Sequence, residues 1–145
     1  PGTPAPEQAA DPRFEQAYAA MEKGDFEGAR TEFDRLLKET PNDTEAQVGR
    51  AQAGLLARSA QLDGSEGVRA AAEPGNIAAQ LAAADAQIIG GDAEAAFSRL
   101  VEVVRTTTGD EREQVRLRLL ELFETLGGSD PAVLKYRRKL ATALF

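Results

Sequence analysis

The chain has 145 residues with 17 basic and 24 acidic side chains, and its net charge of −7 at pH 7 argues against general nucleic-acid binding. It contains neither Cys nor His, which excludes thiol nucleophiles, disulfides, histidine general bases and the usual zinc ligands. Hydrophobic residues make up 42% of the chain but aromatic residues only 6%, and this alanine-rich apolar content favours closely packed helices over a sheet.

The chain begins with a segment that has the composition of a linker. Residues 1–10 contain Pro1, Pro4 and Pro6 among small residues, so we predict a linker at 1–10 and a folded domain at 11–145. Such a start suggests a fragment of a larger protein, and a disordered N-terminus of a complete protein is the alternative. Because no signal-peptide pattern and no apolar run near the roughly 20 residues of a membrane span is present, we expect a cytoplasmic protein without membrane contact.

Helix starts and stops are well marked in the rest of the chain. Asp-Pro at 11–12 and at 130–131 is an N-cap followed by a proline at the first helical position. Asp63 and Asp110 each precede a Glu by three residues, which is capping-box spacing. With the Gly and Pro stops between them, these signals predict eight helices at about 12–23, 26–39, 43–60, 65–73, 76–89, 93–107, 111–126 and 131–144.

One turn sequence occurs twice. Gly-Asp-Phe-Glu-Gly-Ala at 24–29 follows a predicted helix with small residues at Ala17 and Ala20, where two helices would approach closely. The pattern returns as Gly-Asp-Ala-Glu-Ala-Ala at 91–96, about two 34-residue repeats later. This spacing is typical of tetratricopeptide repeats and predicts an all-α stack of about four antiparallel helical hairpins. The second hairpin is degenerate, because Asp63 stands where Ala29 stands in the first.

Helical repeats of this kind bind proteins far more often than they catalyse reactions. In such a stack the first helix of each hairpin lines a concave groove, and the groove positions here are Phe14, Tyr18 and Met21 in the first hairpin and Leu81, Asp85 and Ile88 in the third. These apolar rows suit hydrophobic or unfolded segments of a partner protein. The alternative is that the side chains belong to the core. We expect no carboxylate clamp, because the rows lack Lys, Arg and Asn donors.

The last predicted helix is basic. Tyr136, Arg137 and Arg138 begin a run that either docks on an acidic partner surface or is a solvated face whose cations complement the helix dipole. Leu144 and Phe145 either form an exposed apolar hook or fold back onto the seventh helix. Elsewhere the carboxylates are scattered or serve as caps, and no glycine-rich phosphate loop with a Lys is present. We therefore predict no enzyme activity, no catalytic residue, no metal and no cofactor.

A specific set of residues lies towards the end of the chain. The set comprises the run 119–123, Leu126-Gly127, Asp130-Pro131, the run from Lys135 to Leu140, and Leu144-Phe145. Together these residues resemble the C-terminus of YbbN-type proteins, which are thioredoxin-fold co-chaperones also called chaperedoxins. The resemblance covers about residues 11–145, includes the early turn and the degenerate second repeat, and is closest to actinobacterial members.

The resemblance implies a co-chaperone. Members of the family carry a thioredoxin-like domain before the repeats, hold unfolded clients and pass them to the chaperonin or the Hsp70 system, and residues 1–10 would lie at that domain junction. The implied chaperonin contact falls on the last helix, through a segment with Tyr136, Arg137, Leu140, Leu144 and Phe145. The chain departs from the family in having no thioredoxin domain and no Cys, so it cannot form mixed disulfides alone. The alternative function is a scaffold that orients the missing domain or mediates self-association.

Overall fold

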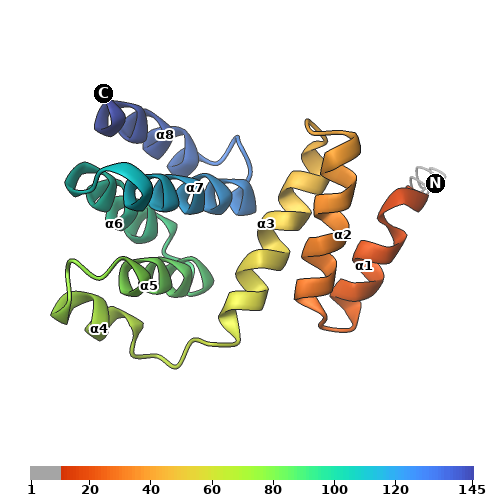
Figure 1. The fold of residues 1–145 in the computed structure, drawn as a ribbon, viewed down its shortest axis with the longest axis horizontal. Coiled ribbons are helices and arrows are strands. Elements are labelled where there is room, and N and C mark those ends of the chain that lie inside the picture. Colours follow the sequence, from red (N-terminus) through yellow and green to blue (C-terminus); the bar gives the residue numbers. More distant parts are fainter. Residues whose placement is uncertain (1–10) are drawn as a thin grey trace, which may run out of the picture.

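The computed structural model describes residues 11–145, and the predicted linker at 1–10 lies outside the described residues. The described part contains helices and no strand, which confirms the all-α prediction (Figure 1). After a short 3-10 helix at Pro12–Phe14, the helices are α1 (Glu15–Glu22), α2 (Phe26–Glu39), α3 (Thr44–Ser59), α4 (Glu66–Ala72), α5 (Ile77–Ile89), α6 (Ala93–Thr106), α7 (Gly109–Leu126) and α8 (Pro131–Leu144). Each predicted helix is present, with ends that differ by a few residues.

The repeated turn uses a glycine and an aspartate in the same way both times. Gly24 and Gly91 have φ values of 77° and 85°, in the left-handed region that glycine adopts without strain. The next residues, Asp25 and Asp92, each accept a hydrogen bond from the amide three residues on, at 2.9 Å and 3.1 Å. These bonds satisfy a free amide in the first turn of α2 and of α6. The two turns therefore share their backbone geometry and their cap.

The two predicted capping boxes had different outcomes. The Glu66 carboxylate accepts hydrogen bonds from the amides of Asp63 and Gly64, at 2.6 Å and 3.0 Å, although the helix itself begins at Glu66. The second prediction was wrong, because α7 begins before Asp110 and has Thr108 at its N-cap position. Asp110 lies instead in the first turn, where a negative charge interacts favourably with the helix dipole.

Alanine pairs let the helices of each regular hairpin approach closely. Ala17 of α1 and Ala29 of α2 are fully buried, as are Ala84 of α5 and Ala96 of α6. α1 packs on α2 and α5 on α6, and small buried side chains on both helices of a pair allow their axes to approach closely.

The second hairpin is where the stack loses its regularity. α3 packs on α2, α5 and α7, whereas α4 packs on α5. A connection at 60–65 carries the chain away from the end of α3 to α4 (Figure 1). The degeneracy predicted from Asp63 thus takes the form of two helices that separate instead of forming a compact hairpin. At the other end of the chain, α8 packs mainly on α6.

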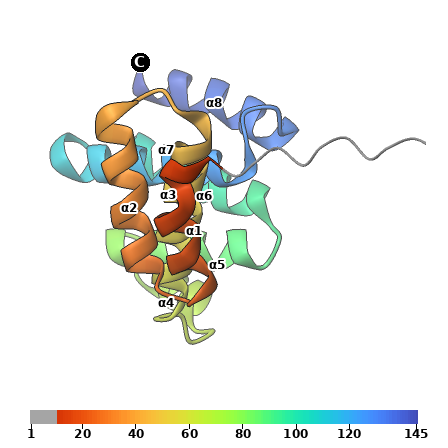
Figure 2. The same ribbon diagram turned by 90° about the vertical axis from the view of Figure 1, so that its right-hand side faces the viewer.

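Two main clusters of buried apolar side chains lie on either side of α3. The N-terminal core joins α1, α2 and α3 around Phe14 and Phe33, and the C-terminal core joins α5 to α8 around Phe97 and Phe123. In Figure 1, α1 to α3 lie beside the other helices, with α8 above and α4 below, and in Figure 2 α1 to α3 lie in front of them. The junction between the two cores is therefore formed largely by α3 and α7.

Candidate partner-binding surfaces

The first predicted groove row lies against the N-terminal core. Phe14 is 1% exposed, and Met21 packs partly buried on the same core. The Tyr18 ring lies 5.9 Å from that of Phe14, and its hydroxyl donates a hydrogen bond to Glu45 of α3. Burial first, and then this carboxylate, raise the pKa of Tyr18 to about 12. Tyr18, which is 40% exposed, is the member of this row that a partner can reach.

The second groove row contains a buried charge. Leu81 is buried, and Ile88 packs partly buried on the C-terminal core. Asp85 of α5 is 2% exposed and accepts hydrogen bonds from two arginines. Arg58 of α3 donates from Nε at 2.8 Å and from Nη2 at 3.2 Å, and Arg118 of α7 donates from Nη1 at 2.9 Å. This row therefore binds α5 to α3 and α7 through ion pairs.

Further ion pairs follow the junction between the two cores. Glu121 of α7 lies 3.6 Å from Arg58 and 3.6 Å from Arg30 of α2. Gly54 of α3 makes this approach possible, because a Cβ there would lie 2.6 Å from Glu121 Oε1. We use the name charged seam for the set Arg30, Arg50, Arg58, Asp85, Arg118, Glu121 and Glu124.

Burial governs the titration of two members of the charged seam. Burial lowers the pKa of Arg118, and the nearby Asp85 carboxylate opposes the shift. Burial also raises the pKa of Glu124, opposed by Arg50 at 3.9 Å. Within residues 11–145, Glu124 Oε2 and Glu121 Oε1 are buried without a hydrogen-bond partner. Glu121 and Glu124 therefore have fewer hydrogen bonds than Asp85 has.

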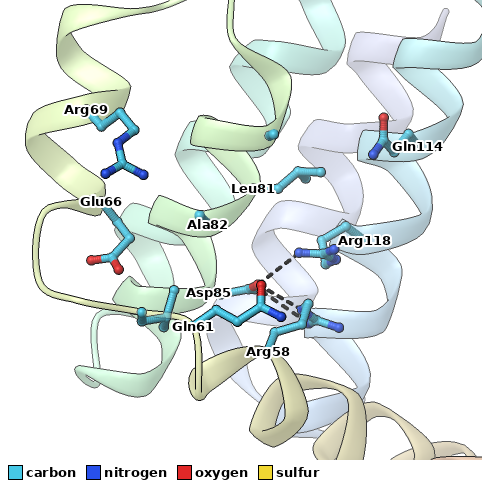
Figure 3. A pocket seen from close by; sticks show the side chains of 11 residues that line it. Arg58, Gln61, Glu66, Arg69, Leu81, Ala82, Asp85, Gln114 and Arg118 are labelled. Carbon is cyan, nitrogen blue, oxygen red and sulfur yellow. Dashed lines mark hydrogen bonds and ion pairs between the residues drawn. The ribbon is translucent and has the colours of Figure 1, made fainter. Parts of the chain in front are cut away.

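Beside Asp85 the charged seam opens into a cleft of about 330 Å³ (Figure 3). Arg69 lies on the α4 wall, Gln114 and Arg118 lie on the α7 wall, and Leu81 lies between the walls. The cleft thus brings together cations and amides from helices that are far apart in the sequence.

Sequence reasoning missed this cleft. The predicted cationic surface was the basic run of the last helix, and the groove rows of the first helices contain no Lys, Arg or Asn. One usable signal was Arg118, which is three residues after Val115 and four before Leu122 and so lies on the same helix face as these two apolar residues. A charge at such a position indicates a buried partner, but the partner residue cannot be read from helix periodicity.

The inner face of α8 belongs to the C-terminal core. Tyr136 and Leu140 are buried, and the Tyr136 ring lies 5.8 Å from that of Phe97. Leu144 packs partly buried on the same core, whereas Phe145 is fully exposed. Of the two alternatives for the chain end, Leu144 therefore folds back onto the core and Phe145 remains open.

The outer face of α8 presents a stripe of exposed residues. Leu134, Arg138, Ala141 and Phe145 are spaced four, three and four residues apart, and all four are exposed. At 100° per residue this spacing places them on one side of the helix, and we call them the outer stripe. Arg137 lies beside the stripe, with its guanidinium 5.2 Å from the centroid of the buried Phe123 ring.

The described part of the chain has neither a metal-binding cluster of acids nor a membrane-spanning helix. Residues 11–145 contain no group of three or more acidic side chains that could hold a metal ion. Over the same range, no helix has the length and apolar character needed to cross a membrane.

Comparison with known proteins places the chain in a family. Residues 65–145, more than half of the chain, match the family model for the tetratricopeptide repeat. The chain belongs to the tetratricopeptide repeat family. This family is a non-catalytic repeat that mediates protein–protein interaction. The matched residues cover α4 to α8, so they include the cleft walls and the outer stripe.

Relatives of this tetratricopeptide chain occur in mycobacteria. Proteins of Mycobacterium bovis and of two strains of Mycobacterium tuberculosis, each described as uncharacterized, are 42% identical over 136 residues, which is 93% of this chain. The match spans only 44% of the length of these relatives. No solved structure matches the chain.

Proposed function

We propose that the chain is the noncovalent protein-binding domain of a thioredoxin-like co-chaperone, which binds unfolded clients and contacts the chaperonin or the Hsp70 system. Three observations support this proposal. The family binds protein partners. The relatives are mycobacterial, which fits the actinobacterial resemblance, and more than half of their length lies outside the match, which leaves room for a thioredoxin-like domain. A cytoplasmic location and a noncatalytic role belong to the same proposal, as does the division into a linker at 1–10 and a repeat domain at 11–145.

The outer stripe of α8 is the observation that carries the proposal. It places two large apolar side chains, Leu134 and Phe145, on either side of the cation Arg138. Aromatic residues and arginine are enriched in protein–protein interfaces, so this grouping supports a partner-binding role. The buried contacts of Tyr136 and Leu140 hold the helix in place, so the stripe is presented on a rigid element.

The proposed partner surface carries charge opposite to that of the whole chain. The chain has a net charge of −7, whereas no acid follows Asp130 and the last helix holds four basic residues. A local field of this kind steers an acidic partner surface towards α8, and it loses strength as salt is added. Among the predicted groove residues, we keep Tyr18 as a candidate contact because it is exposed. We assign Phe14, Met21, Leu81 and Ile88 to the core.

Charge reversal on α8 tests the proposal. We expect Arg138→Glu, alone and with Arg137→Glu, to weaken binding to purified chaperonin or Hsp70 about tenfold or more, because opposite charges become like charges. The single variant is needed because Arg137 also contacts Phe123. Lys38→Glu, an equal charge change at an exposed position of α2, is the control. Unchanged binding together with an unchanged thermal melt would refute the assignment to α8.

Self-association is the second candidate function, and the outer stripe also gives it a basis. Leu134 and Phe145 are apolar enough to pair two α8 helices from two copies of the chain. Light scattering separates the two functions. A stable dimer that Phe145→Ser abolishes, with no chaperone binding, favours a scaffold, whereas a monomer that binds a chaperone favours the first proposal.

A further inference from the structure

The cleft between α4, α5 and α7 contains two acids, and both are already satisfied within the chain. Asp85 accepts hydrogen bonds from Arg58 and Arg118. Glu66 accepts hydrogen bonds from the backbone amides at 63 and 64. Within residues 11–145, Asp85 is thus shared between two arginines, and Arg69 makes no ion pair.

The donors of the cleft are only partly used. Arg118 donates from Nη1 to Asp85, and Arg69 donates from Nη2 to the Ser65 hydroxyl at 3.2 Å. Within residues 11–145 neither guanidinium makes another hydrogen bond, and each has five N–H donors. The side chains of Gln61 and Gln114 also line the cleft without a side-chain hydrogen bond in that range. The cleft therefore offers several N–H donors that could bind an anion.

Arg118 is prepared for a second carboxylate. Its guanidinium is held by the buried Asp85, so it loses little conformational freedom when a further acceptor binds. Burial lowers its pKa, which reflects a cation that has already lost part of its hydration. Charge-assisted hydrogen bonds are strong where water is partly excluded.

The shape of the cleft selects a ligand larger than a simple anion. Arg69 and Arg118 stand on opposite walls with Leu81 and Ala82 between them (Figure 3). A second cavity of about 160 Å³ shares Glu66, Arg69, Ala78 and Ala82 with the cleft and extends it towards the start of α5. The two adjoining cavities form a groove with a cation on each wall and the small apolar side chains of Ala78 and Ala82 among its lining.

We propose that this groove binds an internal acidic segment of a partner protein. Two carboxylates of the segment pair with Arg69 and Arg118, and a small apolar residue between them lies on Ala78 and Ala82. The segment is internal because the groove continues past Arg69 and needs no chain end to fill it. The site is separate from the outer stripe of α8, so it does not depend on the function proposed there.

The proposal is tested by NMR titration of the ¹⁵N-labelled chain with acetyl-Ala-Glu-Ala-Ala-Glu-Ala-amide. The terminal amide removes the chain-end carboxylate, and the same peptide with Gln for Glu removes the charges. We expect saturable shifts at Arg69, Ala82 and Arg118, and binding about fivefold to tenfold weaker for Arg69→Gln and for Gln114→Glu. Gln114→Glu acts by placing a carboxylate on the Arg118 wall. Both positions are exposed, so folding should be retained.

Two control variants make the same changes at exposed positions that do not line the cleft. Arg35→Gln on α2 removes one cation, and Gln52→Glu on α3 adds one carboxylate. Each should bind the acidic peptide as the unmodified chain does. The proposal is overturned if shifts do not saturate, if the Gln peptide binds equally well, or if the controls weaken binding as much as the cleft variants. Competition by inorganic phosphate at the concentration of the peptide would reveal a small-anion site and would also overturn it.

Discussion

The two cores of this chain start from the same alanine-lined helix pair and are completed in different ways. In the N-terminal core, α3 closes the pair, and Gly49 lets the Phe33 ring approach its backbone. In the C-terminal core, α7 and α8 close the pair with larger side chains such as Leu119 and Phe123. The repeated sequence therefore specifies the hairpin, whereas the residues outside the repeat decide what packs on it.

The junction between the two cores differs from both. It is built from the ion pairs of the charged seam, with Asp85 and Glu121 as the central acids. Buried ion pairs add little net stability compared with apolar packing, but a missing partner is costly. The seam therefore contributes more to the specific packing of α3 on α7 than to the net stability of the fold. Variants in the cores and in the seam can separate these contributions.

The largest effect is expected from removing one aromatic ring from either core. Phe33→Ala and Phe97→Ala should each lower the free energy of unfolding by about 3–5 kcal/mol, since both rings are fully buried. Amide hydrogen exchange would locate the loss. We expect Phe33→Ala to expose α1 and α2 while α6 and α7 keep most of their protection. Equal loss of protection in both regions would mean that the two cores unfold as one unit and do not differ in their local stability.

The next largest effect should come from the charged seam. Asp85→Asn leaves Arg58 and Arg118 without their carboxylate and should cost about 2–4 kcal/mol, below the value for a fully buried pair because both arginines are partly exposed. Urea unfolding measures the cost. Glu102→Gln is the control, because the exposed ion pair of Glu102 with Arg105, at 3.0 Å, should contribute almost nothing. Similar costs for the two variants would show that burial of Asp85 has no special role.

Added methyl groups distinguish a rigid neighbour from a flexible one. In Gly49→Ala the new Cβ lies 2.4 Å from the Phe33 ring, which is packed in the core, and we expect a loss of about 2–3 kcal/mol. In Gly54→Ala it meets the Glu121 carboxylate, which can rotate away, and we expect about 1 kcal/mol. Gly67→Ala in α4 meets nothing and should be neutral or stabilising. If thermal melts gave the reverse order for Gly49→Ala and Gly54→Ala, the Phe33 ring would not be the more rigid neighbour.

The sequence predicts the local parts of this structure well because the signals are local. Asp25 and Asp92 mark helix starts, and Ala17 and Ala29 mark a close helix contact, through rules that operate within one or two turns. The packing of α3 on α7 could not be predicted, because periodicity identifies a buried face without identifying its partner.

The same limit applies to the candidate sites. The pairing of Asp85 with Arg58 and Arg118 joins residues on three helices, and no spacing rule connects them. The basic character of α8 was visible in the sequence, but which of its residues face outwards was not. The structure separates Arg138 and Phe145, which are exposed, from Tyr136 and Leu140, which are buried.

The smallest expected effect tests the least satisfied carboxylate of the seam. Burial holds the pKa of Glu124 above its ordinary value of 4.5 in the folded chain, and Arg50 only partly opposes this. Between the ordinary and the raised pKa the folded chain holds a proton that the unfolded chain has lost, so stability falls as the pH rises through this window. At pH 7 Glu124→Gln should therefore leave the melting temperature unchanged or raise it. The gain in the free energy of unfolding should be at most about 1 kcal/mol. Below the ordinary pKa, where Glu124 is protonated in both states, any gain should disappear. A variant that is less stable at pH 7 would mean that the ion pair with Arg50 outweighs burial, and the seam would then stabilise the junction along its whole length.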